Sequence, residues 1–294
     1  MAGEPHDPSI DIVVATVGRT TELARLVDSL VVQPYRPVRL IVVDQNEDDR
    51  VAPILEQLPE DVPAVRLRSE RGLSRARNVG LEVVEGELVA FADDDCWYGP
   101  KLLTQVTRFL GEHPDYGGVT VRLFDASGAP STGHWHSSPG PVNRFNVFFR
   151  ATSCTIFLRR EVVEEVGPFD EELGAGAQTE FLSGEETDYL LRALASGFAV
   201  WYEPSLHVFH PARRRRHDRE SVRAGRQFGM GLGRVLRKHG YPWWYAAYQW
   251  AGAVLGAAVG LAKGRPLDAR FQLSVAQGRI SGWRVPYDPT APDV

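Results

Sequence analysis

The chain has 294 residues, of which 43% are hydrophobic and 24% are charged. These fractions are ordinary for a folded globular protein and exclude global disorder. The net charge of −5 argues against a dedicated nucleic-acid-binding protein, so we expect no nucleic-acid partner. The two cysteines, Cys96 and Cys154, have no metal-type spacing and fit a reducing compartment. Residues 1–7 show no signal-peptide pattern, which predicts that the folded part faces the cytoplasm.

Strand-like and helix-like patterns alternate over the first two hundred residues. Short apolar runs rich in β-branched residues predict strands at 10–15, 38–43, 64–67 and 88–92. Amphipathic spacing predicts helices between them at 20–32, 51–58 and 72–84. The alternation predicts an α/β fold with a mostly parallel central sheet that is flanked by helices.

The pattern changes after residue 124. Residues 125–143 are rich in Ser, Gly, Pro and His, which predicts a long loop. Further strands are expected at 152–158 and 199–202, with a helix at 184–195 between them. Residues 211–240 then hold ten Lys or Arg against two acidic residues, and the uncharged stretch 243–262 follows. We therefore expect one part at 1–212 and a basic, aromatic, helical C-terminal extension at 213–294.

The strand predicted at 88–92 ends in three consecutive carboxylates, Asp93, Asp94 and Asp95. Three like charges in contact cost free energy unless a cation lies between them. Carboxylate and phosphate oxygens suit Mg²⁺ or Mn²⁺, and open α/β sheets bind ligands at the carboxyl ends of their strands. The ends of the first two predicted strands are also polar, with Thr16 and Arg19 after the first and Asp44 after the second. The alternative is a solvated acidic turn; we favour a metal and diphosphate site at this edge.

The helix predicted at 72–84 begins beside a glycine and three arginines, Arg71, Arg75 and Arg77. A helix start offers free backbone N–H groups and the positive end of the helix dipole, and both suit phosphate. Arg77 lies at the margin between the buried face and the polar face, which includes Asn78. The alternative is a solvated basic face. Because carboxylates end the next strand, we favour contact with a diphosphate or a nucleoside.

A second acidic cluster, Glu185, Glu186 and Asp188, opens the helix predicted at 184–195. A helix N-terminus favours carboxylates, so capping explains one or two of them. A third exceeds what capping needs, and a carboxylate here is a candidate general base towards an incoming hydroxyl group. In the loop 125–143, His134 and His136 flank Trp135. Contact of these histidines with a sugar or phosphate is one interpretation, and an ordinary surface loop is the favoured one.

Six segments, in this order and at this spacing, resemble family 2 glycosyltransferases, the inverting enzymes of the A-type glycosyltransferase fold. They are VVATVGR (13–19), IVVD (41–44), GLSRARNVG (72–80), DDD (93–95), VGPFD (166–170) and GEETD (184–188). The resemblance covers about residues 9–211. It implies the A-type fold and the transfer of a sugar from a nucleoside-diphosphate sugar to a hydroxyl acceptor.

The resemblance also implies a donor side. It implies a divalent cation, Mn²⁺ or Mg²⁺, and a donor that is a UDP-sugar by preference or else a dTDP- or GDP-sugar. Asp95 takes the metal-ligand position of the family's Asp-x-Asp motif, and His210 matches a histidine near the metal or diphosphate. Asp44 is expected to bind the base of the nucleotide and Asp93 its ribose, while Asp94 is dispensable for coordination of the metal. The donor-binding positions together are Thr16, Arg19, Asp44, Arg77, Asn78, Asp93 and Asp94.

On the acceptor side, the family's Glu-Asp pair corresponds to Glu185 and Glu186. Its second member is the general base, so Glu186 is the candidate catalytic residue and Glu185 the second choice. The change from Asp to Glu keeps the carboxylate and lengthens the side chain by one methylene. Asp188 and Trp135 are expected on the acceptor side, and the acceptor is a hydroxyl group of a glycan or a lipid-linked compound.

The uncharged stretch 243–262 is long enough to span a bilayer, but it is rich in Ala and Gly. Its Trp and Tyr residues and the flanking arginines favour a helix that lies at the membrane surface. The alternatives are a spanning helix, and a buried helix or dimer contact. The basic run from 213–216 to Lys238 is expected to attract anionic lipid or a lipid-diphosphate acceptor. We therefore expect a cytoplasmic protein at the inner face of the cell membrane.

These expectations combine into a metal-dependent inverting glycosyltransferase of cell-surface glycan, cell-wall polysaccharide or glycolipid synthesis. One alternative is a nucleotidylyltransferase, which calls for a glycine-rich loop after the first strand; residues 16–19, TVGR, are poor in glycine. Another is a non-catalytic sugar-nucleotide-binding module at the membrane. The carboxylates at both acidic clusters argue against that module.

Overall fold

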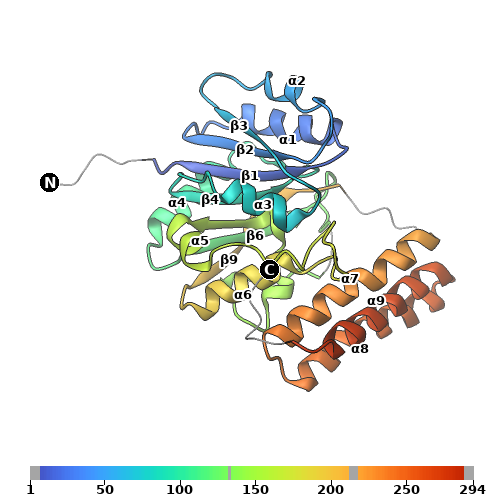
Figure 1. Ribbon diagram of the computed structural model, residues 1–294. Helices are drawn as coiled ribbons and strands as arrows, with labels where there is room; N and C mark the ends of the chain where they lie inside the picture. Colours follow the sequence, from blue (N-terminus) through green and yellow to red (C-terminus); the bar gives the residue numbers. More distant parts are fainter. Residues whose placement is uncertain (1–6, 132–133, 212–217, 288–294) are drawn as a thin grey trace. The chain divides into compact units, whose positions relative to one another are not determined.

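Figure 1 shows the computed structural model of the protein, which describes residues 7–131, 134–211 and 218–287. The chain divides into two compact units. The first, here the sheet unit, comprises Met1–Arg71, Arg75–Pro168 and Tyr189–Arg213. The second, here the helical unit, comprises Gly72–Ser74, Phe169–Asp188 and Arg214–Val294. Residues 169–188 thus group with the C-terminal helices, and the boundary expected between 212 and 213 lies outside the described residues.

The sheet unit is built on a sheet that has nine strands within the described residues, in the order β3-β2-β1-β4-β8-β6-β9-β5, with β7 paired to β9. The strands are β1 (Ile10–Thr16), β2 (Val38–Asp44), β3 (Ala64–Arg68), β4 (Leu88–Asp93), β5 (Trp97–Tyr98), β6 (Gly118–Phe124), β7 (Gly140–Pro141), β8 (Ile156–Arg159) and β9 (Val200–Phe209). The four strands predicted first pair in parallel. Beyond them the sheet is mixed, because β8 runs antiparallel to both β4 and β6.

Helices connect these strands. They are α1 (Thr21–Val31), α2 (Ala52–Leu55), α3 (Leu73–Leu81), α4 (Leu102–Glu112), α5 (Arg160–Val166) and α6 (Glu185–Ala195), with short 3₁₀ turns η1 (Val147–Phe149) and η2 (Ser153–Thr155). The division between the units passes through α3 and α6, whose first residues belong to the helical unit. The α/β class and the A-type arrangement predicted from the sequence are confirmed.

The two faces of the sheet pack against different helices because side chains alternate along each strand. On one face, Ile12 and Val14 of β1 share a core with the apolar stripe of α1. On the other face, α3 approaches so closely that a Cβ on Gly80 would lie 2.6 Å from Cγ1 of Val13. Phe91 of β4, in register with Val13, meets the ring of Tyr189 of α6 edge-on at 5.7 Å. The central strands are therefore covered on both faces.

The register of the parallel strands brings their polar ends together. Thr16, the last residue of β1, is in register with Asp44, the last of β2. On the other side of β1, Ala15 is in register with Asp93, the last residue of β4. The polar residues that follow the apolar runs therefore lie at one edge of the sheet, as the sequence predicts.

The sheet unit differs from the sequence interpretation in several places. The strand predicted at 152–158 begins only at Ile156, after the 3₁₀ turn η2. Helix α4 and strand β6 lie in residues for which no element is predicted. Strand β9 continues to Phe209, seven residues beyond the predicted end at 202. A register shift between β6 and β9 skips residues 204–206 of β9. The sequence Glu203-Pro204-Ser205 hides the continuation of the strand. This extra length carries the chain to His210.

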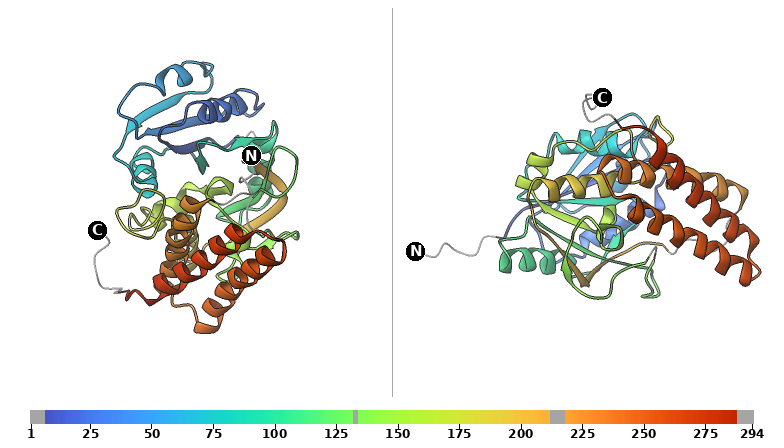
Figure 2. Two further views of the ribbon diagram at one scale, coloured as in Figure 1. Left: turned by 90° about the vertical axis from the view of Figure 1, so that its right-hand side faces the viewer. Right: turned by 90° about the horizontal axis from the view of Figure 1, so that it is seen from below.

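The helical unit contains α7 (Arg219–Lys238), α8 (Trp243–Ala262) and α9 (Pro266–Arg284). Helix α9 packs against both α7 and α8 and lies between them in Figure 1 and in the left-hand view of Figure 2. The contact between α7 and α9 is made by glycines: a Cβ on Gly229 would lie 3.1 Å from Cα of Gly278. The two helix backbones touch, which a larger side chain at either position would prevent.

Helix α8 has the bounds predicted for the uncharged stretch 243–262. In the part of the chain that the structure describes, neither α8 nor any other helix combines the length and the hydropathy of a membrane span.

Candidate functional site

The sheet unit gathers acidic and imidazole groups at the carboxyl ends of β4 and β9. Oxygens of Asp93 and Asp95 and a ring nitrogen of His210 all lie within 4.8 Å of one another, and each side chain is half-buried. Strand β4 ends at Asp93, while the backbone N–H of His210 donates to the carbonyl of Phe124 at the end of β6. Two carboxylates and an imidazole form a donor set that suits Mn²⁺ or Mg²⁺. Among the described residues, this is the cluster that fits a metal ion.

The ring of His210 is oriented by its own backbone neighbour. Its Nδ1 lies 2.8 Å from the carbonyl oxygen of Pro211, which accepts the Nδ1 proton. The other nitrogen, Nε2, then points at Asp95, 3.0 Å from Oδ1. Metal-binding histidines commonly donate their second N–H to a carbonyl in this way, because the bond fixes the tautomer that leaves one nitrogen for the metal.

The pKa values of this pair move in opposite directions. Burial lowers the pKa of His210, but the hydrogen bond and negative charge of Asp95 overcome it, so the pKa is raised above the usual 6.5. Burial raises the pKa of Asp95, yet the contacts with His210 and the charge of Arg19 bring it below the usual 3.8. Asp95 is therefore an anion near neutral pH, as a metal ligand must be.

Asp94 points to a different set of partners. It accepts a hydrogen bond from Oγ1 of Thr16 at 2.8 Å and one from Nη1 of Arg19 at 2.5 Å. The same Arg19 nitrogen lies 2.8 Å from Oδ2 of Asp95. Burial raises the pKa of Asp94, and Arg19 opposes that shift only in part. Asp94 thus anchors the loop after β1, outside the group of three candidate ligands.

Arg77 lies under the acidic edge. Its side chain is fully buried, and Nη2 lies 3.2 Å from Oδ1 of Asp93. The guanidinium carbon is 6.0 Å from the centre of the Phe91 ring. Asn78 follows on the same helix and is half-buried. The structure thus brings Arg77 to Asp93, and its contact with a diphosphate or a nucleoside stays a prediction.

Asp44 is fully buried, and both of its oxygens accept hydrogen bonds from the protein. Oδ1 accepts from the backbone and side-chain nitrogens of Asn46, at 2.9 and 2.7 Å. Oδ2 accepts from Arg66 at 2.6 Å and lies 3.1 Å from Arg68. These contacts lower the pKa of Asp44 against the effect of burial. The carboxylate holds a loop together, and its contact with the base of the nucleotide stays a prediction.

Sequence reasoning missed the two arginines of β3. They occupy alternate positions, so they share a face of the strand, and Arg68 is in register with Asp44. The alternation was readable in the sequence AVRLR, but the pairing of β3 with β2 supplies the partner. Asn46 was also missed, although its Oδ1 accepts the backbone N–H of Gly18 at 2.7 Å and so links the first two loops of this edge.

The second acidic cluster belongs to the helical unit. Glu185 is 4% exposed, and a Cβ on Gly174 would lie 3.2 Å from its Oε2. Gly174 has a φ of +104° and Gly184 one of +92°. Residues other than glycine rarely adopt such positive φ values, so both backbone positions near this carboxylate favour glycine. Glu186 is half-buried, which leaves part of its surface accessible to solvent.

Asp188 is buried and bound to α7. Its Oδ1 lies 2.8 Å from Nε2 of His239 and 3.0 Å from Nζ of Lys238. Lys238 also reaches Oδ2 of Asp170 at 2.6 Å. Burial lowers the pKa of Lys238, but the two carboxylates raise it above 10.5. Asp188 thus ties the first turn of α6 to α7, and an acceptor-side role for it stays a prediction.

Trp135 lies against the sheet rather than in an open loop. Its ring stacks on Tyr202 of β9 with 6.3 Å between centroids. The hydroxyl of Tyr202 donates to the backbone carbonyl of His136 at 2.8 Å. Nε of Arg150 donates to Nδ1 of His136 at 3.0 Å, and burial and that guanidinium lower the pKa of His136. This part of the loop is held by ordered contacts, and contact of Trp135 with an acceptor stays a prediction.

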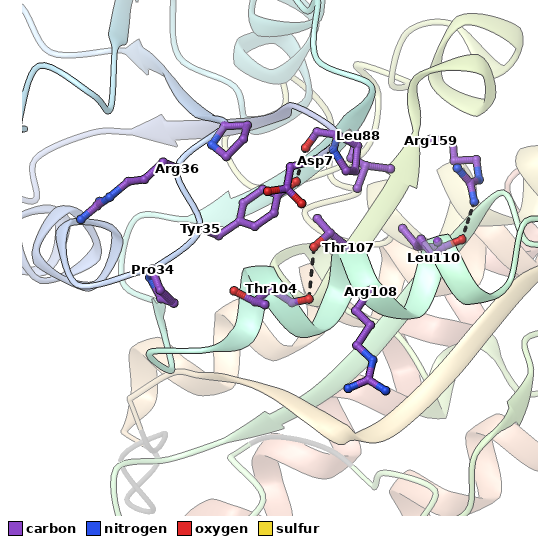
Figure 3. Close-up of a pocket in the computed structure, with 13 residues that line it drawn as sticks. Asp7, Pro34, Tyr35, Arg36, Leu88, Thr104, Thr107, Arg108, Leu110 and Arg159 are labelled. Carbon is purple, nitrogen blue, oxygen red and sulfur yellow. Dashed lines mark hydrogen bonds between the residues drawn. The ribbon is translucent and has the colours of Figure 1, made fainter. Parts of the chain in front are cut away.

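A cavity of about 810 Å³ within the described residues lies elsewhere (Figure 3). Its lining includes Tyr35 and Pro37 before β2 and Leu88 at the start of β4. It therefore opens at the amino ends of the parallel strands. The acidic cluster lies at their carboxyl ends. The lining arginines are engaged: Arg108 pairs with Glu112 at 2.7 Å, and Arg159 donates to the Leu110 carbonyl at 2.8 Å.

Residues 11–167, more than half of the chain, match the family described as Glycosyl transferase family 2. The chain is also similar to the glycosyltransferase AglE of Haloferax volcanii, with 24% identity over 214 residues that cover 70% of this chain and 68% of AglE.

Solved structures show the same fold. The mannosyltransferase PcManGT from Pyrobaculum calidifontis, in complex with GDP-Man and Mn²⁺, aligns with a TM-score of 0.63 and 17% identity over 95% of this chain and 88% of that one. TarS of S. aureus aligns with a TM-score of 0.59 and 18% identity, over 79% of this chain and 42% of TarS. A shorter form, TarS 1–349, was solved with UDP-GlcNAc. The chain thus spans less than half of the TarS chain.

Proposed function

The chain belongs to glycosyl transferase family 2, and from that premise we propose that it transfers a sugar from a nucleoside-diphosphate sugar to a hydroxyl acceptor, with a divalent cation and with inversion. The observation that carries the proposal is the group formed by Asp93, Asp95 and His210 at the carboxyl edge of the sheet. Membership of the family leaves the nucleotidylyltransferase and the non-catalytic module without support.

The donor set supports the metal. Asp95 is the residue we assign as the ligand of Mn²⁺ or Mg²⁺, with His210 beside it and its Nδ1 held by the Pro211 carbonyl. A divalent cation at this place supplies positive charge to a diphosphate leaving group as its bond to the sugar breaks. The Mn²⁺ bound in the structure of PcManGT supports the assignment of this kind of ion.

Cationic side chains of this chain support a diphosphate at the same edge. Arg19 is bound to both Asp94 and Asp95 and is half-exposed, so its guanidinium can also contact a ligand. Arg77 is buried and holds Asp93, the residue assigned to the ribose. We keep a UDP-sugar as the preferred donor and a GDP- or dTDP-sugar as the alternatives. PcManGT was solved with GDP-Man and TarS 1–349 with UDP-GlcNAc.

For the acceptor, we assign Glu186 as the general base that removes the proton of the attacking hydroxyl group, with Glu185 as second choice. Glu186 is half-buried, whereas Glu185 is packed against Gly174, and this difference supports the order of the two. A single displacement from the face opposite the diphosphate inverts the anomeric configuration. The acceptor we propose is a glycan or lipid-linked compound of cell-wall, polysaccharide or glycolipid synthesis at the cytoplasmic face of the membrane.

A donor panel tests the proposal. The full chain is mixed with Mn²⁺ and a set of UDP-, GDP- and dTDP-sugars, and thermal stabilisation and slow donor hydrolysis are measured. We expect one class of nucleotide to stabilise the protein and its sugar to be released. Stabilisation by a nucleoside triphosphate but by none of the nucleotide sugars would contradict the proposal.

A further inference from the structure

Helix α8 has one buried face and one exposed apolar face. It packs against α9, and the residues on its buried face include Tyr245, Gln249, Ala253 and Ala257. Opposite them, at helical spacing of three and four residues, lie exposed side chains. They are Trp243 (75% exposed), Trp244 (53%), Tyr248 (58%), Val254 (51%), Leu255 (67%), Val259 (44%) and Leu261 (61%).

This apolar face is long, and the next helix also carries exposed apolar side chains. Twenty residues of α helix extend about 30 Å, and Leu267 and Leu273 of α9 add exposed apolar surface, at 37% and 44%. Exposed apolar patches of this length on a protein surface mark contact sites. Figures 1 and 2 show α8 as the outer of the three C-terminal helices, with α9 on one side. Within the described residues, no other element covers its outer face.

The surroundings of this face are basic. Helix α8 has no charged residue, and it leads directly into Lys263 and Arg265, both exposed, with Arg270 exposed on α9. Between residues 243 and 287 the sequence contains five Lys or Arg and a single acid, Asp268. Tryptophan and tyrosine favour the headgroup region of a bilayer, and each Lys or Arg near an anionic surface strengthens binding.

We propose that the outer face of α8, together with Lys263, Arg265 and Arg270, docks on a lipid bilayer that contains anionic headgroups. A second copy of this chain would bring the same cations and the same single acid, so it offers them no opposite charge, whereas anionic lipid does. The helix lies in the plane of the surface with its α9 face outward. This surface is the one through which the enzyme would reach a membrane-bound acceptor, and in that respect the inference rests on the proposed function.

Vesicle binding tests the inference. The full chain is mixed with vesicles of phosphatidylcholine alone or of phosphatidylcholine and phosphatidylglycerol, and binding is measured by flotation. We expect binding to the anionic vesicles that weakens as salt is added. The variant Trp244→Glu/Leu255→Glu should bind at least about tenfold more weakly, and Lys263→Gln and Arg265→Gln roughly fivefold more weakly each. Both Trp244 and Leu255 are mostly exposed, so neither change buries a charge.

The matched control is Val32→Glu, which places a charge on an exposed apolar residue of the sheet unit, 59% exposed. This variant should bind vesicles as the unchanged chain does. The inference is overturned if the unchanged chain binds neither kind of vesicle. It is overturned as well if the double variant binds vesicles as strongly as the unchanged chain. It is also overturned if light scattering shows a dimer that the double variant converts to a monomer, because a second copy then covers the face.

Donor hydrolysis in the absence of vesicles separates this inference from the proposed function. The double variant should hydrolyse the donor as the unchanged chain does, since Trp244 and Leu255 lie outside the residues assigned to catalysis or donor binding. If the unchanged chain hydrolyses no nucleotide sugar, the proposed function fails while the vesicle result stands. If hydrolysis is normal and vesicle binding is absent, the docking surface fails alone.

Discussion

Lys238 and Asp188 form a buried ion pair, with 3.0 Å between Nζ and Oδ1 and at most 8% of either side chain exposed. Lys238 is the last residue of α7, and Asp188 lies in the first turn of α6, two residues after Glu186. The pair therefore fixes the turn of α6 that carries the candidate base.

The first prediction concerns this pair. Replacing Lys238 by methionine keeps the length of the side chain but leaves Asp170 and Asp188 without the ammonium group. Removing one partner of a buried ion pair costs about 3 kcal/mol, because the remaining charge stays buried. We expect a fall of that size in the free energy of unfolding, measured by urea denaturation. The double variant Lys238→Met/Asp188→Asn should lose less than the sum of the single changes; strict additivity would show that the two side chains do not interact.

The second prediction concerns the glycines between α7 and α9. A Cβ on Gly278 would collide with the carbonyl oxygen of Arg226 and lie 3.0 Å from Cα of Gly229. Gly278→Ala should therefore lower stability by about 1–3 kcal/mol, since helix backbones must move apart. Gly252 of α8 is the control, because nothing lies within 4 Å of a Cβ there. Gly252→Ala should raise stability by up to about 1 kcal/mol through helix propensity alone. Thermal unfolding of both variants measures the difference.

Local pattern was enough to predict the first half of the fold. The first four strands are short runs of mostly apolar residues, and the observed bounds differ from the predicted ones by one residue at most, as in Leu88–Asp93 against 88–92. Polar residues at their ends were correctly placed at one edge because parallel strands share a direction. The uncharged run that forms α8 was also placed at its observed bounds.

Long-range contacts explain what the sequence could not predict. Strand β6 is stabilised by pairing with β8 and β9, which follow it by tens of residues. The grouping of Phe169–Asp188 with the C-terminal helices depends on contacts such as that of Asp170 with Lys238. The candidate metal ligands show both cases. Asp95 was visible in its acidic run, whereas His210 was expected near the metal only through the family resemblance. Its position beside Asp95 depends on the full length of β9.

The third prediction concerns the metal. Asp95→Asn removes an anionic ligand, so its affinity for Mn²⁺ should fall by at least about tenfold, measured by calorimetry. Asp94→Asn is the matched control: Asp94 is bound to Thr16 and Arg19, so Mn²⁺ affinity should change little. Chelation should abolish donor hydrolysis and added Mn²⁺ should restore it. Equal Mn²⁺ affinities in the two variants would remove Asp95 from the ligand set.

The fourth prediction concerns the base. Glu186→Gln keeps the shape of the side chain and removes its ability to accept a proton, so transfer should slow by about 10²- to 10⁴-fold. Binding of the nucleotide sugar should be unchanged. Glu185→Gln is the comparison, since Glu185 is buried against Gly174. A loss of turnover in Glu185→Gln alone would move the role of base to Glu185.

The fifth prediction concerns acid stability and Asp11 of β1. Its buried carboxylate accepts hydrogen bonds from Arg39 at 2.6 and 2.9 Å and from the backbone N–H groups of Glu85 and Gly86 at 2.7 and 2.9 Å. Burial raises the pKa of Asp11, but these bonds prevail and lower it below 3.8. Because the folded pKa lies below the unfolded one, the carboxylate stabilises the fold above about pH 3.9 and loses that effect as the pH falls through the folded value.

Asp11→Asn should therefore be less stable than the unchanged chain at neutral pH, because the amide cannot carry the charge that Arg39 and the two backbone donors bind. The difference in melting temperature between the two proteins should shrink as the pH falls below the unfolded pKa of about 3.9 and towards the lowered folded pKa of Asp11. Arg108→Gln, which breaks an exposed pair with Glu112, serves as the control and should change the melting temperature little at any pH. A difference that stays constant from neutral to acid pH would show that Asp11 stabilises the fold by its shape and not by its charge.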